Sequence, residues 1–227
     1  MQETGSRITV LVKEDGFSIY NGCARSEWLG AGCIFSQPEF QKRYDEVCIS
    51  VFTPKFTLVP EHFFSPERAR EILAETVTLN PDDQASYAAL PQVGAVAVFS
   101  TSRCCQLARV IHESLRRTDG SKGELYPEQY HMLKALDSIT DYNKIIASYA
   151  DGYLHLVVAQ GRTLLLCNSF EAADFTTAEY FLFLVLRKFQ LNPEVSTLYF
   201  RTPLRPEEEE SLYGYFHAVE SFTDDRA

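Results

Sequence analysis

Two Asp-Gly dipeptides, each set between runs of strand-forming residues, most strongly limit how this chain can fold. They are Asp15-Gly16 and Asp151-Gly152. A two-residue type I′ turn needs positive φ at both positions, and Asp-Gly between apolar runs is a strong signal for such a hairpin. More strand and then a helix follow each hairpin, so the sequence predicts two similar α/β halves with a cleft between them. The flanking runs are residues 8–12, 17–20, 145–149 and 153–158.

The first half continues with further strand and helix signals. Ser65 as N-cap and Pro66 at the first helical position predict one helix, and a second is expected over about residues 102–117. Residues 80–91 indicate a polar loop, and Asp119–Gly123 is the best linker candidate. The chain therefore divides into a first lobe over residues 1–120 and a second over 121–227. Strands are expected over residues 46–52, 56–59 and 94–99.

The second half has a clearer pattern. Thr176 and Glu179 have capping-box spacing, and the expected helix from Thr177 to Leu191 is apolar nearly all round. Such a helix should be buried on most sides, so we expect it to be the most buried helix of the chain. A strand over Thr197–Phe200 and a helix from Pro206 follow. This β-β-β-α-β-α order is typical of a ribonuclease-H-like lobe, and two copies make an actin-like α/β fold.

Charge and composition exclude several classes of partner. Lys and Arg total 21 against 31 Asp and Glu, so the formal net charge is −10. A field of that sign opposes binding to nucleic acid or to an anionic membrane. The longest apolar run, Tyr180–Leu186, is far shorter than the roughly 20 residues that cross a bilayer. Residues 1–7 lack the apolar core of a secretion signal. We expect a cytoplasmic protein with no nucleic-acid partner and no membrane insertion.

Short motifs spread over most of the chain, namely Asp15–Ser18, Val59-Pro60, Phe63-Phe64, His131, Leu133, Leu165–Phe170, Asp174-Phe175 and Tyr180–Phe183. Together they resemble the signature of a bacterial family of unknown function with an actin-like ATPase fold. The resemblance implies two duplicated ribonuclease-H-like lobes, and its motifs carry no known chemistry. In that family more chain usually follows the last helix, which leaves open whether the second lobe is complete here.

The candidate binding residues are those of the two turns: Asp15, Gly16, Asp151 and Gly152. Actin-like and Hsp70-like ATPases hold phosphate in two glycine-rich hairpins, one in each half, whose backbone N–H groups reach the phosphates. Here a bulky aromatic, Phe17 or Tyr153, follows each turn glycine and hinders a close approach of phosphate. Thr202–Leu204 stands where a Gly-Gly adenosine motif would be sought. Structural turns are the favoured interpretation, against remnants of a nucleotide site, and no cofactor is assigned.

Other polar residues give no stronger signal. The five histidines are isolated, without HxxxH spacing or a matching cysteine pair, so no metal site is expected. Cys104-Cys105 at a helix start, where a dipole can activate a thiolate, is more simply a pair of buried thiols. Asp137 and Asp141 could bind a cation, but a helix-end cap is the simpler account. The six cysteines are scattered, which fits reduced thiols.

No catalytic residue emerges from the sequence. We therefore expect a non-catalytic actin-like protein that acts through contact with an unidentified protein partner. The alternative is a divergent ATP-binding protein or kinase of the actin and Hsp70 superfamily, with altered phosphate loops. The sequence does not reveal the oligomeric state.

Overall fold

The computed structural model describes residues 6–22 and 24–222, apart from the side chains of residues 103 and 105. Its first sheet has the order β3-β2-β1-β5-β10. The hairpin strands β1 and β2 are antiparallel, as are β2 and β3, whereas β5 runs parallel to β1 and to β10. The strands are β1 (Arg7–Val12), β2 (Gly16–Tyr20), β3 (Leu29–Gly30), β5 (Glu46–Val51) and β10 (Glu124–Pro127).

The second sheet repeats this order, as β13-β12-β11-β14-β15. Three antiparallel strands are again followed by two parallel ones. The two predicted hairpins, β1–β2 and β11–β12, therefore occupy the same place in their sheets, which confirms the duplication. The strands are β11 (Asn143–Ala150), β12 (Tyr153–Gln160), β13 (Thr163–Glu171), β14 (Thr197–Phe200) and β15 (Ala218–Ser221).

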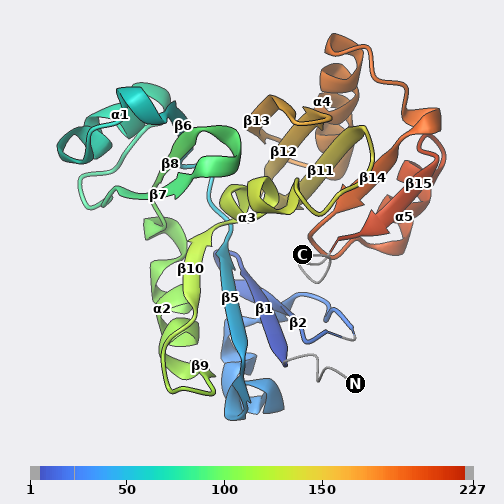
Figure 1. The fold of residues 1–227 in the computed structure, drawn as a ribbon. Helices are drawn as coiled ribbons and strands as arrows, with labels where there is room; N and C mark the ends of the chain where they lie inside the picture. The colour runs from blue at the N-terminus through green and yellow to red at the C-terminus, as the bar shows by residue number, and fades with distance from the viewer. Residues whose placement is uncertain (1–5, 23, 223–227) are drawn as a thin grey trace.

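A third sheet is inserted in the first half between β5 and α2. It has the order β6-β8-β7, and it lies at the upper left of Figure 1, beside the second sheet at the upper right and above the first sheet. Its strands are β6 (Phe56–Pro60), β7 (Ser86–Leu90) and β8 (Ala95–Phe99). The short strands β4 (Arg43–Tyr44) and β9 (Arg116–Arg117) pair separately.

The helices cover these sheets in layers. The first sheet packs on α2, one face of the second sheet packs on α4 and α5, and the inserted sheet packs on α1. Helix α3 lies at the centre of the molecule, between the second and the inserted sheets (Figure 1). The helices are α1 (Ala69–Thr76), α2 (Cys105–Ser114), α3 (Glu128–Ala135), α4 (Phe175–Lys188) and α5 (Pro206–Tyr213). The 3-10 turns are Ala31–Ser36, Pro38–Gln41, Glu61–Phe63, Pro66–Arg68, Pro91–Val93, Ser102–Cys104 and Pro193–Val195.

The most buried helix is α3 and not α4, so that expectation is wrong. Every residue of α3 except Lys134 is buried, whereas α4 leaves the side chains of Tyr180 and Leu184 61% and 44% exposed. The reason is position, because α3 is covered by two sheets and α4 by only one. The expected capping box is also wrong: Asp174 is the N-cap of α4, and its carboxylate accepts the backbone N–H of Thr177 at 2.7 Å.

Other element boundaries also differ from the expectations. Strand β7 lies in the segment expected to be a loop, and the parallel edge strand β15 was not predicted. Ser65 does not cap a helix with its side chain; a 3-10 turn precedes α1 instead. Strand β10 pairs with β5 in the first sheet although it lies beyond the boundary expected at residue 120. The first sheet thus takes its last strand from the segment assigned to the second lobe.

Candidate functional site

The two hairpins face each other across the lobes, but their Asp-Gly dipeptides do not occupy equivalent positions. In the first hairpin the backbone N–H of Lys13 donates to the carbonyl of Gly16 at 2.8 Å, so Glu14 and Asp15 form the two-residue loop. In the second, Ala150 pairs with Tyr153, so Asp151 and Gly152 form the loop. In the second hairpin Asp-Gly is the loop itself, whereas in the first hairpin Asp15 is the second loop residue and Gly16 begins the next strand. The first dipeptide is therefore shifted by one residue toward the C-terminus.

Burial supports this one-residue offset. Successive residues of a strand point to opposite faces, so a shift of one residue moves a side chain to the other face. Phe17 faces the core of the first lobe, and Leu154, which has the same place after its loop, faces the core of the second. The structural counterpart of Phe17 is Leu154, and the counterpart of Asp151 is Glu14. Phe17 and Tyr153 each follow a glycine in the sequence, but they do not occupy equivalent positions in the two hairpins.

The backbones of the two turns differ accordingly. Asp151 and Gly152 have φ of 50° and 75°, as a type I′ turn requires. Asp15 and Gly16 do not have positive φ, so the type I′ turn predicted there is wrong. Gly16 has a different structural role: a Cβ at this position would lie 2.6 Å from the carbonyl oxygen of Leu29 in β3. Gly16 therefore allows the neighbouring strand to approach the hairpin closely.

Two of the four candidate residues, Asp15 and Asp151, come together with Lys13 and Glu14 in a clasp between the two hairpins. The backbone N–H of Glu14 donates to Oδ2 of Asp151 at 2.8 Å, and Lys13 Nζ lies 3.7 Å from Oδ1 of the same carboxylate. Lys13 also pairs with Asp15, and this hydrogen bond lowers the pKa of the Asp15 carboxyl. The side chain of Asp151 is 11% exposed and that of Asp15 is 79% exposed. Asp151 is thus the central anion of the clasp.

A small cavity lies between the lobes. It measures about 180 Å³, and Arg25–Glu27 line it on the first-half side and Thr202–Leu204 on the second-half side. The hydroxyl of Thr202 is used internally, because it accepts the backbone N–H of Tyr149 at 2.9 Å. The segment where an adenosine motif was sought therefore does line an inter-lobe cavity, but a small one.

A buried ion pair joins the two lobes behind the clasp. Glu128, the first residue of α3, accepts from Arg201 Nε at 2.8 Å and from the hydroxyl of Ser148 at 2.9 Å. It also accepts from the hydroxyl of Ser50 in β5. Burial alone would raise the pKa of Glu128, but the charge and hydrogen bonds of Arg201 and the bond from Ser50 outweigh it, so the pKa is lowered. The pair is thus held ionised although both side chains are almost completely buried.

A neutral polar cluster continues from this pair. Gln129 Nε2 donates to the carbonyl of Thr53 at 2.8 Å and to the hydroxyl of Ser169 at 3.0 Å. That hydroxyl lies 2.8 Å from Nδ1 of His155, whose ring stacks on Phe52 with a centroid separation of 4.0 Å. Burial lowers the pKa of His155 to about 3, so its imidazole is neutral. This cluster connects β5, α3, β12 and β13 and indicates a structural role.

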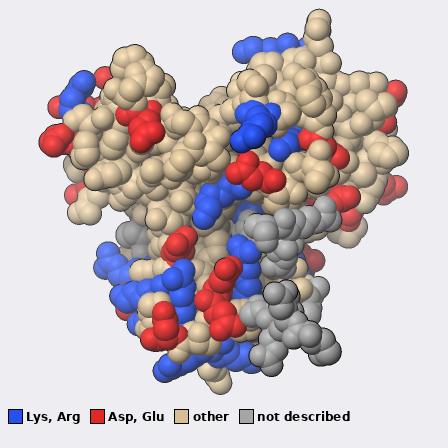
Figure 2. Space-filling model, in the orientation of Figure 1, with Lys and Arg blue, Asp and Glu red and all other residues tan. Residues whose placement is uncertain are grey.

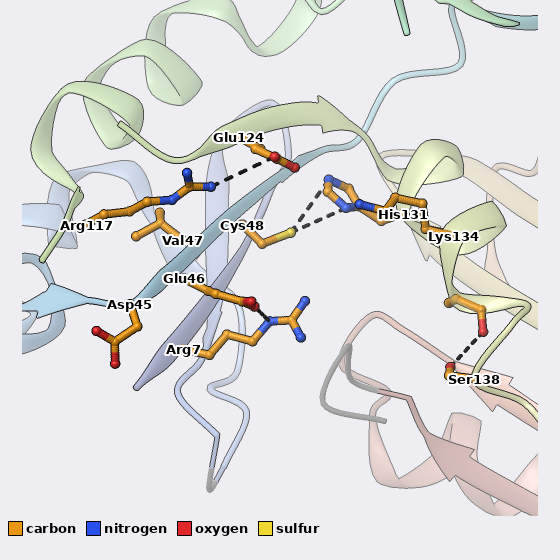
Figure 3. Close-up of a pocket in the computed structure, with 11 residues that line it drawn as sticks. Arg7, Asp45, Glu46, Val47, Cys48, Arg117, Glu124, His131, Lys134 and Ser138 are labelled. Carbon is orange, nitrogen blue, oxygen red and sulfur yellow. Dashed lines mark hydrogen bonds and ion pairs between the residues drawn. The ribbon is translucent and has the colours of Figure 1, made fainter. Parts of the chain in front are cut away.

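A larger cavity of about 510 Å³ lies on the other side of α3, against the first sheet (Figure 3). Cys48 of β5 points toward His131 of α3, with Sγ 3.4 Å from Nδ1 and 3.7 Å from Nε2. Two ion pairs border the cavity, Arg7–Glu46 at 3.3 Å and Arg117–Glu124 at 4.0 Å. Neither residue of this pair was predicted as a site from the sequence. Its residues are far apart in the chain, and only the position of α3 brings them together.

The remaining candidates are structural in the described part of the chain. Cys104 is buried and donates to the carbonyl of Phe52 at 3.3 Å; the side chain of Cys105 lies outside the described residues. Asp141 accepts from the hydroxyl of Tyr199 at 2.9 Å. Among residues 6–22 and 24–222, no three His, Cys, Asp or Glu side chains gather as ligands for a metal ion.

Figure 2 shows Lys, Arg, Asp and Glu intermingled over the first lobe, so charges of opposite sign alternate on this face. None of the described helices has both the length and the apolar character needed to span a membrane.

Comparison with known proteins agrees with this architecture. A family model described as protein of unknown function (DUF3822) matches residues 31–219. The chain belongs to this family. No curated protein matches it. The family match therefore agrees with the resemblance that the sequence motifs showed.

Solved structures show the fold of this family member. A Bacteroides thetaiotaomicron protein, described as having an actin-like ATPase fold and unknown function, is similar with a TM-score of 0.64 and 18% identity. The match covers 94% of this chain and 89% of that one. A chain of the PilM–PilN type IV pilus biogenesis complex is similar with a TM-score of 0.54 and 11% identity, over 97% and 89% of the two chains. The DUF3822 protein therefore has an actin-like fold.

Proposed function

We propose that this protein is a non-catalytic member of the actin-like fold and that it acts by binding another protein. The observation that carries the proposal is the clasp between the hairpins. In an ATPase of this fold, backbone N–H groups of the two hairpins would receive phosphate. Here the N–H of Glu14 and the ammonium of Lys13 already face a carboxylate, that of Asp151. The chain supplies its own anion where a nucleotide would place one.

Electrostatics and space both support this proposal. A phosphate entering the clasp would meet the negative charge of Asp151 and would have to displace it from Lys13 and from the N–H of Glu14. The inter-lobe cavity of about 180 Å³ is smaller than the roughly 300–1,000 Å³ of usual small-molecule sites. The carbonyl of Leu29 lies so close to Gly16 that a Cβ there would be 2.6 Å from it, so β3 packs tightly against the first hairpin.

The test is titration calorimetry of the full chain with Mg-ATP. We expect no saturable binding at millimolar nucleotide and no ATP hydrolysis. The alternative, a divergent ATP-binding protein or kinase, predicts a saturable isotherm. If the chain binds nucleotide, a free nucleotide concentration of 100 times the Kd would also raise the free energy of unfolding by about 2.7 kcal/mol. A saturable isotherm that Asp151→Asn or Asp15→Asn abolishes would contradict the non-catalytic proposal and favour the alternative.

The apolar face of α4 supports the protein-binding part of the proposal. Tyr180 and Leu184 lie one turn apart on this helix and are exposed. Beside them Tyr215 packs on Phe183 at a centroid distance of 4.8 Å, and it is also exposed. Exposed apolar patches of this kind mark interaction surfaces. Glu179, which precedes Tyr180 in α4, accepts the hydroxyl of Ser211 in α5 at 2.6 Å, so a carboxylate lies between these two helices. We infer that the occupant is an amphipathic partner helix with apolar residues flanked by Lys or Arg. A net charge of −10 supports such a partner over nucleic acid.

Pull-down from the native host tests this surface with matched variants. We expect Leu184→Ser and Tyr180→Ser to lose a protein that the unchanged chain captures. Phe63→Ser, which removes an even more exposed apolar side chain from the inserted segment, should keep it. Analytical sedimentation of the same three variants shows whether the patch instead binds a second copy of this chain. Equal capture by all variants, or loss of a dimer in place of a partner, would contradict the proposed occupant.

A further inference from the structure

The cavity between α3 and the first sheet contains a thiol beside a base. Cys48 Sγ lies 3.4 Å from Nδ1 and 3.7 Å from Nε2 of His131, and both residues line the cavity of about 510 Å³ (Figure 3). A thiolate and not a thiol is the nucleophile, and a neighbouring imidazole favours the thiolate by taking its proton. The cavity gives small molecules a route to a sulfur atom that is otherwise buried.

The other described cysteines lack this arrangement. Burial raises the pKa of Cys167 to about 12, which keeps it a thiol. Cys104 donates to the carbonyl of Phe52. Cys33 is half-buried among the first-lobe core residues. Of these four thiols, only Cys48 faces both a histidine and a cavity.

Most charged side chains around the Cys48–His131 pair have a partner of opposite charge or a hydrogen-bond donor. The carboxylates of Glu46 and Glu124 pair with Arg7 and Arg117, and Asp45 accepts the backbone N–H of Ser6 at 2.8 Å and the hydroxyl of Thr118 at 3.1 Å. Lys134, on the same helix as His131, lies over the ring of Tyr130, and no carboxylate of residues 6–22 and 24–222 forms an ion pair with it. Its positive charge favours a thiolate in the cavity.

Groups of α3 and β10 complete the surroundings. Tyr130 and Tyr126 place their rings edge-on to His131, at centroid distances of 5.6 and 6.2 Å. The buried carboxylate of Glu128 lies one turn before His131 and attracts its positive charge. A proton on the imidazole is therefore stabilised from one side by Glu128 and from the other by a Cys48 thiolate.

We propose that Cys48 is a reactive thiol, with His131 as its base, and that the cavity makes it a site of oxidation to a sulfenic acid by a small hydroperoxide. His131 takes the thiol proton, and a sulfur electron pair attacks the outer peroxide oxygen. The O–O bond breaks, and the departing oxygen takes the proton from the imidazolium. Cys48 becomes a sulfenic acid and the hydroperoxide is reduced to an alcohol or water. Sulfur is oxidised and peroxide is reduced, so no further co-reactant is needed.

Alkylation with iodoacetamide across pH 5–10, mapped by mass spectrometry on the native full chain, tests the reactivity. We expect the rate of Cys48 to rise with a midpoint below about 8.5, the value of a free thiol. Cys33, which is half-buried against the first-lobe core, serves as the internal control. His131→Gln should move the Cys48 midpoint upward and slow its reaction at pH 7 by about tenfold for each pH unit of that shift. A Cys48 midpoint at or above that of Cys33 would overturn the proposal.

Because His131 is buried, its replacement could disturb folding, so an exposed variant gives a second measurement. Lys134→Glu should raise the midpoint of Cys48 while leaving that of Cys33 unchanged. In parallel, the chain is treated with hydrogen peroxide and the sulfenic acid is trapped with dimedone. We expect the trapped adduct on Cys48 first. An adduct on Cys33 with none on Cys48, or a midpoint unmoved by Lys134→Glu, would contradict the assignment.

Discussion

The two lobes build the same sheet around different hairpins. Both follow the order of three antiparallel and two parallel strands, yet the first hairpin closes over Glu14-Asp15 and the second over Asp151-Gly152. The first lobe keeps its glycine for a close contact with β3, and the second keeps its glycine for a left-handed turn. The Asp-Gly dipeptide therefore has a different structural role in each lobe. The two copies are similar in sequence but do not occupy equivalent positions.

The lobes also differ in what they contribute to their contact. The second supplies the anion, Asp151, and the first supplies the donors, Lys13 and the N–H of Glu14. Behind the clasp, Glu128 is held by Ser50 from the first sheet and by Arg201 and Ser148 from the second. This asymmetry sets a carboxylate of one lobe against donors of the other.

The largest expected effect comes from the buried pair that joins the lobes. Arg201→Met leaves the Glu128 carboxylate buried without its charged partner, which should cost about 3–5 kcal/mol of unfolding free energy. Urea unfolding at pH 7 measures it. The double variant Glu128→Leu/Arg201→Met removes both charges and should recover most of the loss. If the single variant unfolded like the unchanged chain, the pair would not hold the lobes together.

Core substitutions test the one-residue offset between the hairpins. Phe17 and Leu154 are both fully buried, so Phe17→Ala should cost about 3–5 kcal/mol and Leu154→Ala about 2–5 kcal/mol. Tyr153 is half-buried, and Tyr153→Ala should cost clearly less. The three variants are compared by urea unfolding. A large loss for Tyr153→Ala with a small loss for Leu154→Ala would restore the simple alignment of the two Asp-Gly dipeptides.

The sequence predicts the sheets better than the contacts between them. Alternating apolar residues and turn residues are local signals, and they identify both hairpins and most strands correctly. Local signals could not predict that α3 is more buried than α4, because the sheets that cover a helix come from distant parts of the chain. Leu184 has the same apolar character as buried Leu182, and nothing local distinguishes them. For the same reason Glu128 resembles an ordinary acidic residue at a helix start.

The candidate site shows the same limit. The duplicated pattern predicts the two hairpins, and Asp15 and Asp151 lie in their loops. That Asp151 crosses to the other lobe depends on how the lobes sit together, which no local spacing encodes. Cys48 and His131 are 83 positions apart and come into contact only through α3.

A pH experiment separates the two lobes, because His155 of the second occupies the place of Ser18 in the first. Native His155 has a pKa of about 3, lowered by burial, against about 6.5 when unfolded. Below pH 6.5 the unfolded chain therefore takes up a proton that the native chain does not. Stability from this group is present above pH 6.5 and is lost as the pH falls toward 3, by about 1.4 kcal/mol per pH unit.

The unchanged chain and His155→Gln are compared by urea unfolding at pH 7, 6 and 5. We expect the variant to have a shallower loss of stability across this range. The lowered pKa of Glu128 acts in the same direction but below about pH 4.5, outside the range measured. Parallel slopes for the two proteins would show that His155 is protonated in the native state.

The smallest expected effect distinguishes the two aspartates of the clasp. Asp151 is nearly covered and accepts the N–H of Glu14, whereas Asp15 is largely exposed and pairs with Lys13. Asp15→Asn should change unfolding free energy by no more than about 0.5 kcal/mol, because exposed ion pairs contribute little. Asp151→Asn keeps a turn-forming residue and an acceptor oxygen but loses the charge, so it should cost about 1–2 kcal/mol. Both variants should fold, and urea unfolding at low and high salt measures the difference. Because the Asp151 carboxylate is shielded from solvent, the loss of stability in Asp151→Asn should remain at high salt, whereas the small effect of Asp15→Asn should disappear there. Equal effects of the two substitutions would mean that the clasp is a surface contact and that the cleft is open to a ligand.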